Sequence, residues 1–463
     1  MKAKIPLILG LFVLTQLATV SPAASRSEIV CGQTIMEDTI IQADLTCPAD
    51  TVAITIGASN ITLDLGGHTV FGQYPGIGVF ADGVGGITIK NGALEGHNDA
   101  VFLFNTHNVT VEYLQVRQLT DSDINHLIRG IVVVSSQRVA VRDSFFEYYP
   151  EFHREAVEVY ESDVIVSDIE VRSGGAGVNF AFAGSCDPVN RPSNGVVRNS
   201  RFVDLRHGVL VACSSSTRIS GNVISPEVWM GITAEGASPG DVTGVVFEGN
   251  VVSSLYRGVE LGGTSNVTVS HNIIRDGYQG IALVPSMGCT TPETGEECYY
   301  PTGITVTYNQ VFSNTLDLYH DPNIHGNVWE RNTCETKEGN EIPACLPLTA
   351  ALFTNFPSGK PGSFFTVEGA NFPAESDATI TINGTLLGTI PTDASGELLF
   401  LLDTEHAGAG FYTVTVSTAD VSSSARFILS SRNLRHDQED EGTIFEVPSG
   451  IGVGVLYLPF TVR

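Results

Sequence analysis

Residues 245–252 read Val-Val-Phe-Glu-Gly-Asn-Val-Val, and residues 267–274, which begin 22 positions later, read Val-Thr-Val-Ser-His-Asn-Ile-Ile. Both stretches alternate side chains in the manner of a β-strand, and a Gly or Asn then marks a turn. The same pattern starts again at residues 61, 87, 109, 139, 164, 195, 217 and 304. The chain is therefore built on a repeat of about 22 residues, with insertions between some copies.

A second short strand follows in each repeat and opens on a small residue, as in Gly-Val-Glu-Leu at 258–261. Strands this short cannot bury an apolar face alone, so we expect the repeats to stack as coils that pair in parallel, about 4.8 Å apart. A leucine-rich repeat would need leucines at fixed offsets, and a β-sandwich would need hairpins. Over residues 51–346 the sequence instead predicts an all-β parallel β-helix, a solenoid.

Different patterns flank this repeat. Residues 1–24 combine two lysines, an apolar run and a small-residue end, which is the layout of a secretory signal peptide. We expect residues 25–50 to cap the first coil, because an open stack exposes strand edges. Residues 347–431 have short alternating strands with hairpin turns, which predict a small β-sandwich similar to immunoglobulin-like modules. Residues 432–463 form a charged linker and an apolar C-terminal tail.

The opening and the close of the repeat carry a family resemblance. Residues 61–72 read Ile-Thr-Leu-Asp-Leu-Gly-Gly-His-Thr-Val-Phe-Gly, and residues 327–334 read Asn-Val-Trp-Glu-Arg-Asn-Thr-Cys. With Cys-Gly-Gln at 31–33, these stretches resemble the secreted bacterial right-handed parallel β-helix proteins, which include carbohydrate-binding sugar hydrolases and the periplasmic β-helix protein of nitrous-oxide reductase maturation. The resemblance implies a right-handed solenoid that is secreted, periplasmic or at the cell surface. It implies no single activity, because this fold serves many.

The net charge limits the classes of binding partner, and the cysteines indicate disulfides rather than a metal site. A formal net charge of −27 repels nucleic acid and weighs against bare uronic-acid polymers, so neutral or amino sugars fit better. Eight cysteines in an exported chain indicate disulfides, and none has metal-ligand spacing. Their spacing favours a sequential pairing, although eight cysteines allow 105 pairings: Cys31 with Cys47, Cys186 with Cys213, Cys289 with Cys298, and Cys334 with Cys345. Glycines and prolines in the tail argue against a stable membrane span in the mature chain.

Stacked coils bring equivalent residues side by side. The residue before each strand-opening small residue gives one column, and the residue two positions after it gives a second. On one solvent-facing surface these columns would place catalytic candidates Glu155, Glu158 and His207, and substrate-binding candidates Arg129, Asn179, Arg257 and Glu260. Glu155 and His207 are two coils apart, about 9–10 Å, so Glu155 or Glu158 could serve as general acid and His207 as base. The alternative is a solvated sheet face with ion pairs such as Arg129 with Glu155.

Two insertions add further candidates. Tyr148, Tyr149, His153 and Arg154 are substrate-binding candidates, because aromatic rings stack on sugars; the alternative is that the tyrosines only cover the rod. Residues 121–125 read Asp-Ser-Asp-Ile-Asn and could hold calcium. They lack the glycine and distal glutamate of hand-type calcium loops, so an ordinary turn is favoured and no metal ligand is assigned.

Three functions remain open at this point. The first is binding of an extracellular polysaccharide, with hydrolase or lyase activity as an extension. The compact motifs of polygalacturonases and alginate epimerases are absent, however. The second is a non-catalytic cell-surface adhesion or spacer module. The third, by analogy with the maturation protein, is periplasmic metal delivery. No pattern in the chain predicts an oligomeric state.

Overall fold

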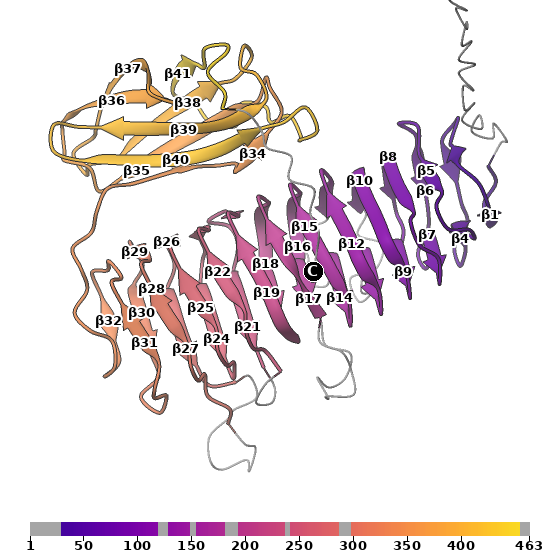
Figure 1. Cartoon of the computed structure of the whole chain (residues 1–463), viewed down its shortest axis with the longest axis horizontal. Helices are drawn as coiled ribbons and strands as arrows, with labels where there is room; N and C mark the ends of the chain where they lie inside the picture. Colours follow the sequence, from indigo (N-terminus) through magenta and orange to yellow (C-terminus); the bar gives the residue numbers. More distant parts are fainter. Residues whose placement is uncertain are drawn as a thin grey trace, which may run out of the picture.

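The computed structural model describes residues 29–118, 128–148, 154–180, 193–236, 241–286 and 298–453, and this part of the chain contains no helix. Strands β1–β32 form one continuous sheet that winds into a rod, and β33–β41 form two smaller sheets beside it (Figure 1). The pairings between rod strands are parallel and join one coil to the next. The protein is therefore a right-handed parallel β-helix followed by a small β-sandwich, as the repeat and the resemblance predicted.

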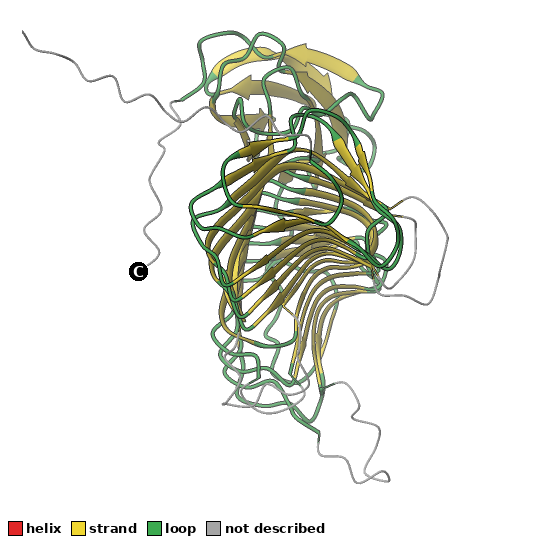
Figure 2. Cartoon of the chain, turned by 90° about the vertical axis from the view of Figure 1, so that its right-hand side faces the viewer, coloured by secondary structure: helices red, strands yellow, loops and turns green. Residues whose placement is uncertain are grey.

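The rod has three faces, named here sheets I, II and III, and Figure 2 views the rod roughly along its axis, with the strands of successive coils one behind another. Sheet I consists of β1 (Gln33–Ile35), β4 (Val52–Ile56), β7 (Ile77–Asp82), β9 (Asp99–Phe104), β11 (Ile128–Val134), β14 (Arg154–Tyr160), the second halves of β16 (Glu170–Phe180) and β18 (Arg201–Val211), β21 (Met230–Glu235), β24 (Arg257–Gly262), β27 (Gln279–Val284), β30 (Leu316–His320) and β32 (Lys337–Glu338).

Sheets II and III complete each coil. Sheet II consists of β2 (Thr39–Ile40), β5 (Thr62–Asp64), the first halves of β8 (Thr88–Glu95) and β10 (His107–Gln118), β12 (Gln137–Arg142), β15 (Asp163–Ser167), β17 (Ser193–Arg198), β19 (Ser214–Ser220), β22 (Val246–Glu248), β25 (Thr268–Ser270), β28 (Thr305–Thr307) and β31 (Val328–Glu330). Sheet III consists of β3 (Leu45–Thr46), β6 (Thr69–Phe71), the second halves of β8 and β10, β13 (Phe145–Tyr148), the first halves of β16 and β18, β20 (Val223–Ile224), β23 (Val251–Ser253), β26 (Ile273–Arg275) and β29 (Gln310–Phe312).

The core of the rod is a set of apolar stacks that run along its axis. One stack on the inner face of sheet I is fully buried and contains Val133, Val159, Phe180, Val211, Ala234, Leu261 and Leu283. Burying one such side chain stabilises a fold by about 1.5–3 kcal/mol. Stacking therefore supplies the burial that a single coil cannot achieve.

The turn between sheets II and III repeats in each coil. Its first residue has a positive φ, for example Gly249 at 63° and His271 at 56°. The next residue in five coils is a buried asparagine, and these form a ladder of Asn222, Asn250, Asn272, Asn309 and Asn332. Each amide in the ladder donates to the side-chain oxygen of the next, at 2.9–3.0 Å. These hydrogen bonds join the turns of successive coils.

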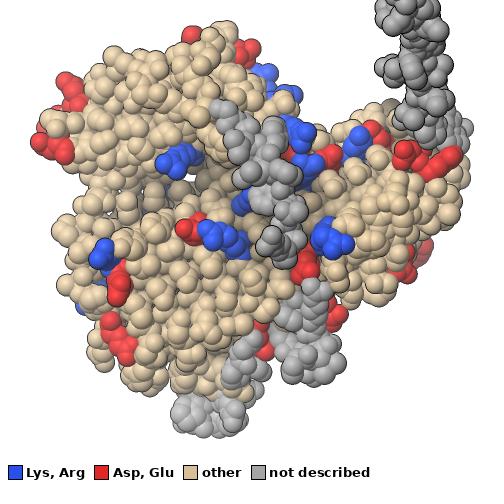
Figure 3. Space-filling model, in the orientation of Figure 1, with Lys and Arg blue, Asp and Glu red and all other residues tan. Residues whose placement is uncertain are grey.

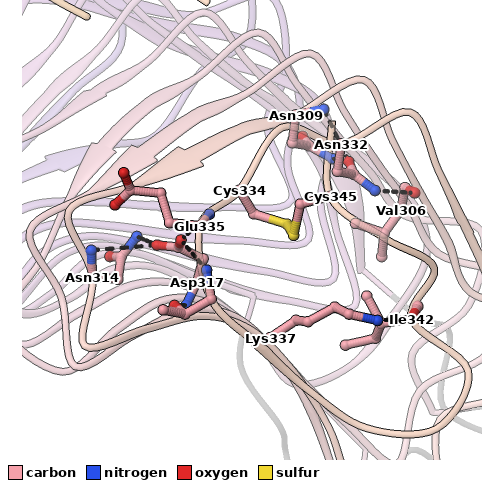
Figure 4. The surroundings of a disulfide bond; sticks show 11 residues. Val306, Asn309, Asn314, Asp317, Asn332, Cys334, Glu335, Lys337, Ile342 and Cys345 are labelled. Carbon is pink, nitrogen blue, oxygen red and sulfur yellow. Dashed lines mark hydrogen bonds between the residues drawn. A yellow bond between two sulfur atoms is a disulfide. The ribbon is translucent and has the colours of Figure 1, made fainter. Parts of the chain in front are cut away.

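Disulfides close both ends of the rod. Cys31 pairs with Cys47 at the start, and Cys334 pairs with Cys345 at the end, as predicted. Figure 4 shows the second bridge between the last rung of the asparagine ladder and Asp317, whose carboxylate accepts backbone N–H groups of Glu335 and Thr336 at 2.7 and 3.0 Å. The last coil is therefore tied by covalent and polar contacts.

The remaining cysteines are only partly described. Cys213 and Cys298 are disulfide-bonded, while Cys186 and Cys289 lie outside the described residues. Those two pairings therefore stay predictions. Residues 1–28, which include the expected signal peptide, the 121–125 stretch and the tail from 454 onward also lie outside the described part of the chain. Within that part no helix is long and apolar enough to cross a membrane.

The C-terminal unit is a sandwich of two sheets around its own apolar core. One sheet has the order β33 (Ala351–Thr354), β35 (Phe364–Ala370), β38 (Leu398–Asp403) and β41 (Thr443–Glu446). The other has the order β34 (Ser358–Gly359), β40 (Ser422–Leu429), β39 (Gly410–Ser417), β36 (Asp377–Ile382) and β37 (Thr385–Pro391). Most pairings inside it are antiparallel, because hairpins connect neighbouring strands.

The sandwich lies against sheet III of the rod. Arg201 on β18 stacks its guanidinium 4.2 Å from the centre of the Phe356 ring and bonds Glu439 at 2.9 Å. Arg275 on β26 likewise bonds Glu368 at 2.6 Å. Beside these contacts a cleft of about 1000 Å³ separates the two units, and Figure 3 shows the hollow. Sheet III is thus partly covered, and sheets I and II face away from the sandwich.

Candidate functional site

Sheet I aligns the two predicted columns along the rod. Pairing from β9 to β27 places in the first column Asp99, Arg129, Glu155, Ala176, His207, Met230, Arg257 and Gln279. The second column contains Phe102, Val132, Glu158, Asn179, Leu210, Thr233, Glu260 and Ala282. The predicted register of both columns is confirmed, and hydrogen bonds between them show that they share one face.

An ion network around Arg129 forms the N-terminal part of this face. The guanidinium binds both carboxylate oxygens of Asp99, at 2.7 and 3.0 Å, and one oxygen of Glu158 at 3.1 Å. The Tyr160 hydroxyl donates to the other oxygen of Glu158 at 2.5 Å. Asp99 and Glu158 are both 3% exposed, so Arg129 and Tyr160 compensate carboxylates that water barely reaches.

Glu155 has a different environment. Its two carboxylate oxygens accept hydrogen bonds from the Asn179 amide, both at 3.0 Å. Burial, and next to it the nearby charge of Glu158, raise the pKa of Glu155 to about 8. Two carboxyls in hydrogen-bonding contact cannot readily both ionise, so this pair holds a proton at neutral pH. Glu155 therefore has the protonation state of a general acid.

His207 lies two coils from Glu155, and only the methyl group of Ala176 occupies the column between them. Its Nδ1 lies 3.3 Å from the hydroxyl oxygen of Thr233. Burial, assisted by the charge of Arg206, lowers the pKa of His207 to about 4. The ring is therefore neutral at neutral pH and is able to accept a proton.

A second charged group lies further along sheet I. Arg257 bonds Gln279 at 2.7 Å and also Glu260, which is 4% exposed. The same guanidinium lies 4.7 Å from the centre of the Tyr256 ring. This group repeats the arrangement around Arg129, with a buried carboxylate bound by an arginine from the neighbouring column.

The expectation of a fully solvent-facing surface is wrong for four residues. Glu158, Asn179, His207 and Glu260 are between 3% and 7% exposed. Arg129, Asn179 and Arg257 pair across the columns with Glu158, Glu155 and Glu260, an effect that the repeat alone does not reveal. The expected pair of Arg129 with Glu155 is also wrong, because Arg129 bonds Asp99 and Glu158 instead.

Of the four substrate-binding candidates near the tyrosine insertion, the structure describes only the side chain of Tyr148. Tyr148 is 3% exposed and packs in the core of the rod, so it offers no ring face to a sugar. It ends strand β13 with its side chain turned inward, because side chains alternate along a strand. Tyr149 and His153 lie outside the described residues, as does the side chain of Arg154, the first residue of β14.

Sequence reasoning missed Tyr160 and an aromatic group formed by the exposed Trp229 and Tyr278 with the half-buried Tyr256 between them. Tyr160 follows Glu158 by two positions, so alternation along β14 would have placed it on the same face. Each residue of the aromatic group stands one position before the first column, at Met230, Arg257 and Gln279. That constant offset was the signal for a third column.

Two family profiles match the chain. "Right handed beta helix region" matches residues 77–240, and "Periplasmic copper-binding protein (NosD)" matches residues 160–341. Each covers less than half of the chain, so the matches support the fold and leave the activity open. No curated protein matches.

Solved structures are similar at low identity. The mannuronan C-5 epimerase AlgE6 A-module of Azotobacter vinelandii has a TM-score of 0.50 and 14% identity, over 69% of this chain and 89% of that one. The catalytic domain of a GH87 α-1,3-glucanase with nigerose has a TM-score of 0.46 and 12% identity, over 69% of this chain. The match spans 62% of the glucanase domain. At this identity the likeness concerns the fold alone.

The name of the second profile includes copper binding, so we compared the described residues with a copper site. Among the described residues no group of three or more His, Cys, Asp or Glu side chains is placed to hold a metal ion. The buried carboxylates on sheet I bind arginines instead. The described residues thus do not fit a copper site.

Proposed function

We propose that the outer face of sheet I binds a neutral or amino-sugar extracellular polysaccharide and hydrolyses it by acid–base catalysis. One observation carries the proposal: Glu155, held protonated beside Glu158, shares a column with the neutral His207, with only Ala176 between them. The two disulfides at the rod ends support an oxidising compartment, in keeping with a secreted, periplasmic or cell-surface protein.

In this mechanism the side chains divide the work. Glu155 donates its proton to the glycosidic oxygen as the bond to the leaving sugar breaks. His207 takes a proton from the attacking water, and their two-coil separation of about 9–10 Å leaves room for that water. Asn179 orients the acid, and Glu158, held by Arg129 and Tyr160, maintains its raised pKa.

The test is release of new reducing ends from a panel of soluble polysaccharides. Glu155→Gln keeps the size of the side chain and one oxygen that can accept from Asn179, but it cannot donate the proton, so turnover should fall by about 10²–10⁴. Glu330→Gln, an exposed glutamate on β31 of sheet II, is the matched control and should leave turnover unchanged. An active Glu155→Gln protein, or a wild-type protein inert on every substrate, would contradict the proposed hydrolysis.

A non-catalytic binding or spacer module is the second candidate. The observation that favours it is the completeness of the network, since Asp99, Arg129, Glu158 and Tyr160 already bond one another. This candidate predicts glycan binding without any turnover, and binding that is unchanged in Glu155→Ala with His207→Ala.

A further inference from the structure

An exposed aromatic column runs along the edge of sheet I. Trp229, Tyr256 and Tyr278 stand immediately before β21, β24 and β27, one in each of three successive coils. Trp229 is 47% exposed and Tyr278 is 51% exposed, and Leu255 beside them is 56% exposed. Monomeric proteins seldom expose several large apolar side chains together unless the patch binds something.

The three rings form a continuous stack. The centres of Trp229 and Tyr256 are 5.2 Å apart with 15° between their planes, and those of Tyr256 and Tyr278 are 5.8 Å apart with 4° between them. Tyr256 is covered on both sides by its neighbours, whereas Trp229 and Tyr278 end the stack. Arg257 lies 4.7 Å from the Tyr256 ring centre and is itself bound to Gln279 and Glu260. The column is therefore fixed in place before any ligand arrives.

We propose that this stack is a platform for hexopyranose units of a neutral or N-acetylated glycan. A pyranose ring has an apolar face of C–H groups and a rim of hydroxyls, which fits an apolar strip bordered by Arg257 and the tyrosine hydroxyls. The net charge of −27 disfavours an acidic partner. The patch has only four side chains, far fewer than the 20–30 residues that each side of a stable protein–protein interface contributes.

The position of the platform extends the proposed site. His207 lies on β18, and the next coil begins with Trp229 and Met230. A glycan that is cleaved near Glu155 and runs along the rod would continue over these rings at about 4.8 Å per coil. The role of the platform as a distal subsite rests on the proposed hydrolysis, but its binding of sugar is measurable without it.

The chain contains a built-in reporter for this proposal. It has two tryptophans, of which Trp329 is 4% exposed and Trp229 is 47% exposed. Cellohexaose, maltohexaose and chitohexaose are titrated separately into the full chain, and tryptophan emission is followed. We expect at least one of them to shift or quench the emission. Calorimetry should show about tenfold weaker binding in Trp229→Ala and in Tyr278→Ala.

Tyr308→Ala is the matched control, since Tyr308 is also exposed and stacked, on His271, but at the turn between sheets II and III. Its binding should equal that of the wild type. The platform is overturned if no hexasaccharide changes the emission at millimolar concentration, or if Trp229→Ala binds as well as wild type. It is also overturned if the wild type self-associates in sedimentation and Trp229→Ala does not. If a hexasaccharide binds but no reducing ends are released, the platform is supported and the proposed hydrolysis is contradicted. If the wild type releases reducing ends but Trp229→Ala binds sugar as well as the wild type does, hydrolysis is supported and the platform is contradicted.

Discussion

Glu155 shows how a β-helix adjusts the acidity of one side chain. Its strand neighbours are fixed by register, so Glu158 lies beside it and Asn179 lies one coil further on. A surface carboxyl would be ionised at neutral pH, but burial and the second carboxyl together keep the proton in place. Because ionisation of Glu155 is disfavoured in the folded protein, the stability of the protein should depend on pH.

Because folding raises the pKa of Glu155 from 4.5 to about 8, the folded state binds more protons than the unfolded state between these values. Its contribution to stability is therefore full below pH 4.5 and is lost as the pH rises through 8. Glu155→Gln removes this titration. Urea denaturation at pH 5 and pH 8.5 should show a smaller loss of stability in Glu155→Gln than in the wild type, by about 4 kcal/mol at most. Parallel pH profiles of the two proteins would contradict this account of Glu155.

At the residue scale the sequence predicted which side chains share a column but not how they pair. Position follows from the repeat, since each coil has the same two strands. Pairing depends on side-chain reach, and Arg129 spans to Glu158 in the second column as well as to Asp99 in its own. The sequence also could not predict which of these side chains are buried, because burial depends on the side chains of the neighbouring coils.

At the scale of elements, the asparagine ladder shows why the coils stack without slipping. Asn250 donates to the Ile219 carbonyl oxygen at 3.0 Å and to the Asn272 side chain at 2.9 Å, and its side-chain oxygen accepts from the backbone and amide of Asn222. The repeat pattern predicted a turn at a Gly or Asn of each coil. The left-handed residue is the one before the ladder, such as Gly249, and the asparagine acts through its amide.

Replacing Asn250 by alanine should remove hydrogen bonds from three buried neighbours, namely Ile219, Asn222 and Asn272. We expect a loss of about 3 kcal/mol in the free energy of unfolding, measured by urea denaturation followed by circular dichroism, with native β content before the transition. Asn98→Ala, in a half-exposed loop position, is the control and should change stability by less than about 0.5 kcal/mol. Equal effects of the two substitutions would show that the ladder is not the stabilising feature.

At the scale of the whole molecule, the sandwich limits where a long ligand can lie. It contacts sheet III through Arg201, Phe356 and Glu439, and leaves sheet I free on another side of the rod. The sequence predicted that a sandwich follows the rod. It could not predict the docking, because Arg201 and Glu439 are 238 residues apart and each reads as an ordinary surface charge.

Arg201→Ala removes the contact with Phe356 and the bonds to Glu170 and Glu439 together. Both units have their own cores, so we expect them to stay folded while the sandwich moves away from the rod. Small-angle X-ray scattering should then show a larger radius of gyration with unchanged circular dichroism. Arg218→Ala, which breaks an exposed pair with Glu248 on sheet II, should leave the radius unchanged. An unchanged radius in Arg201→Ala would mean that this cluster does not hold the units together.

A crystal structure of Glu155→Gln soaked with the hexasaccharide that binds most tightly would show whether a glycan lies along the outer face of sheet I. We predict sugar rings over Ala176 and His207 that continue toward Trp229. Sugar bound instead in the cleft beside the sandwich, or in the groove of about 600 Å³ on sheet II that Arg138 and Arg218 line, would contradict this placement of the glycan.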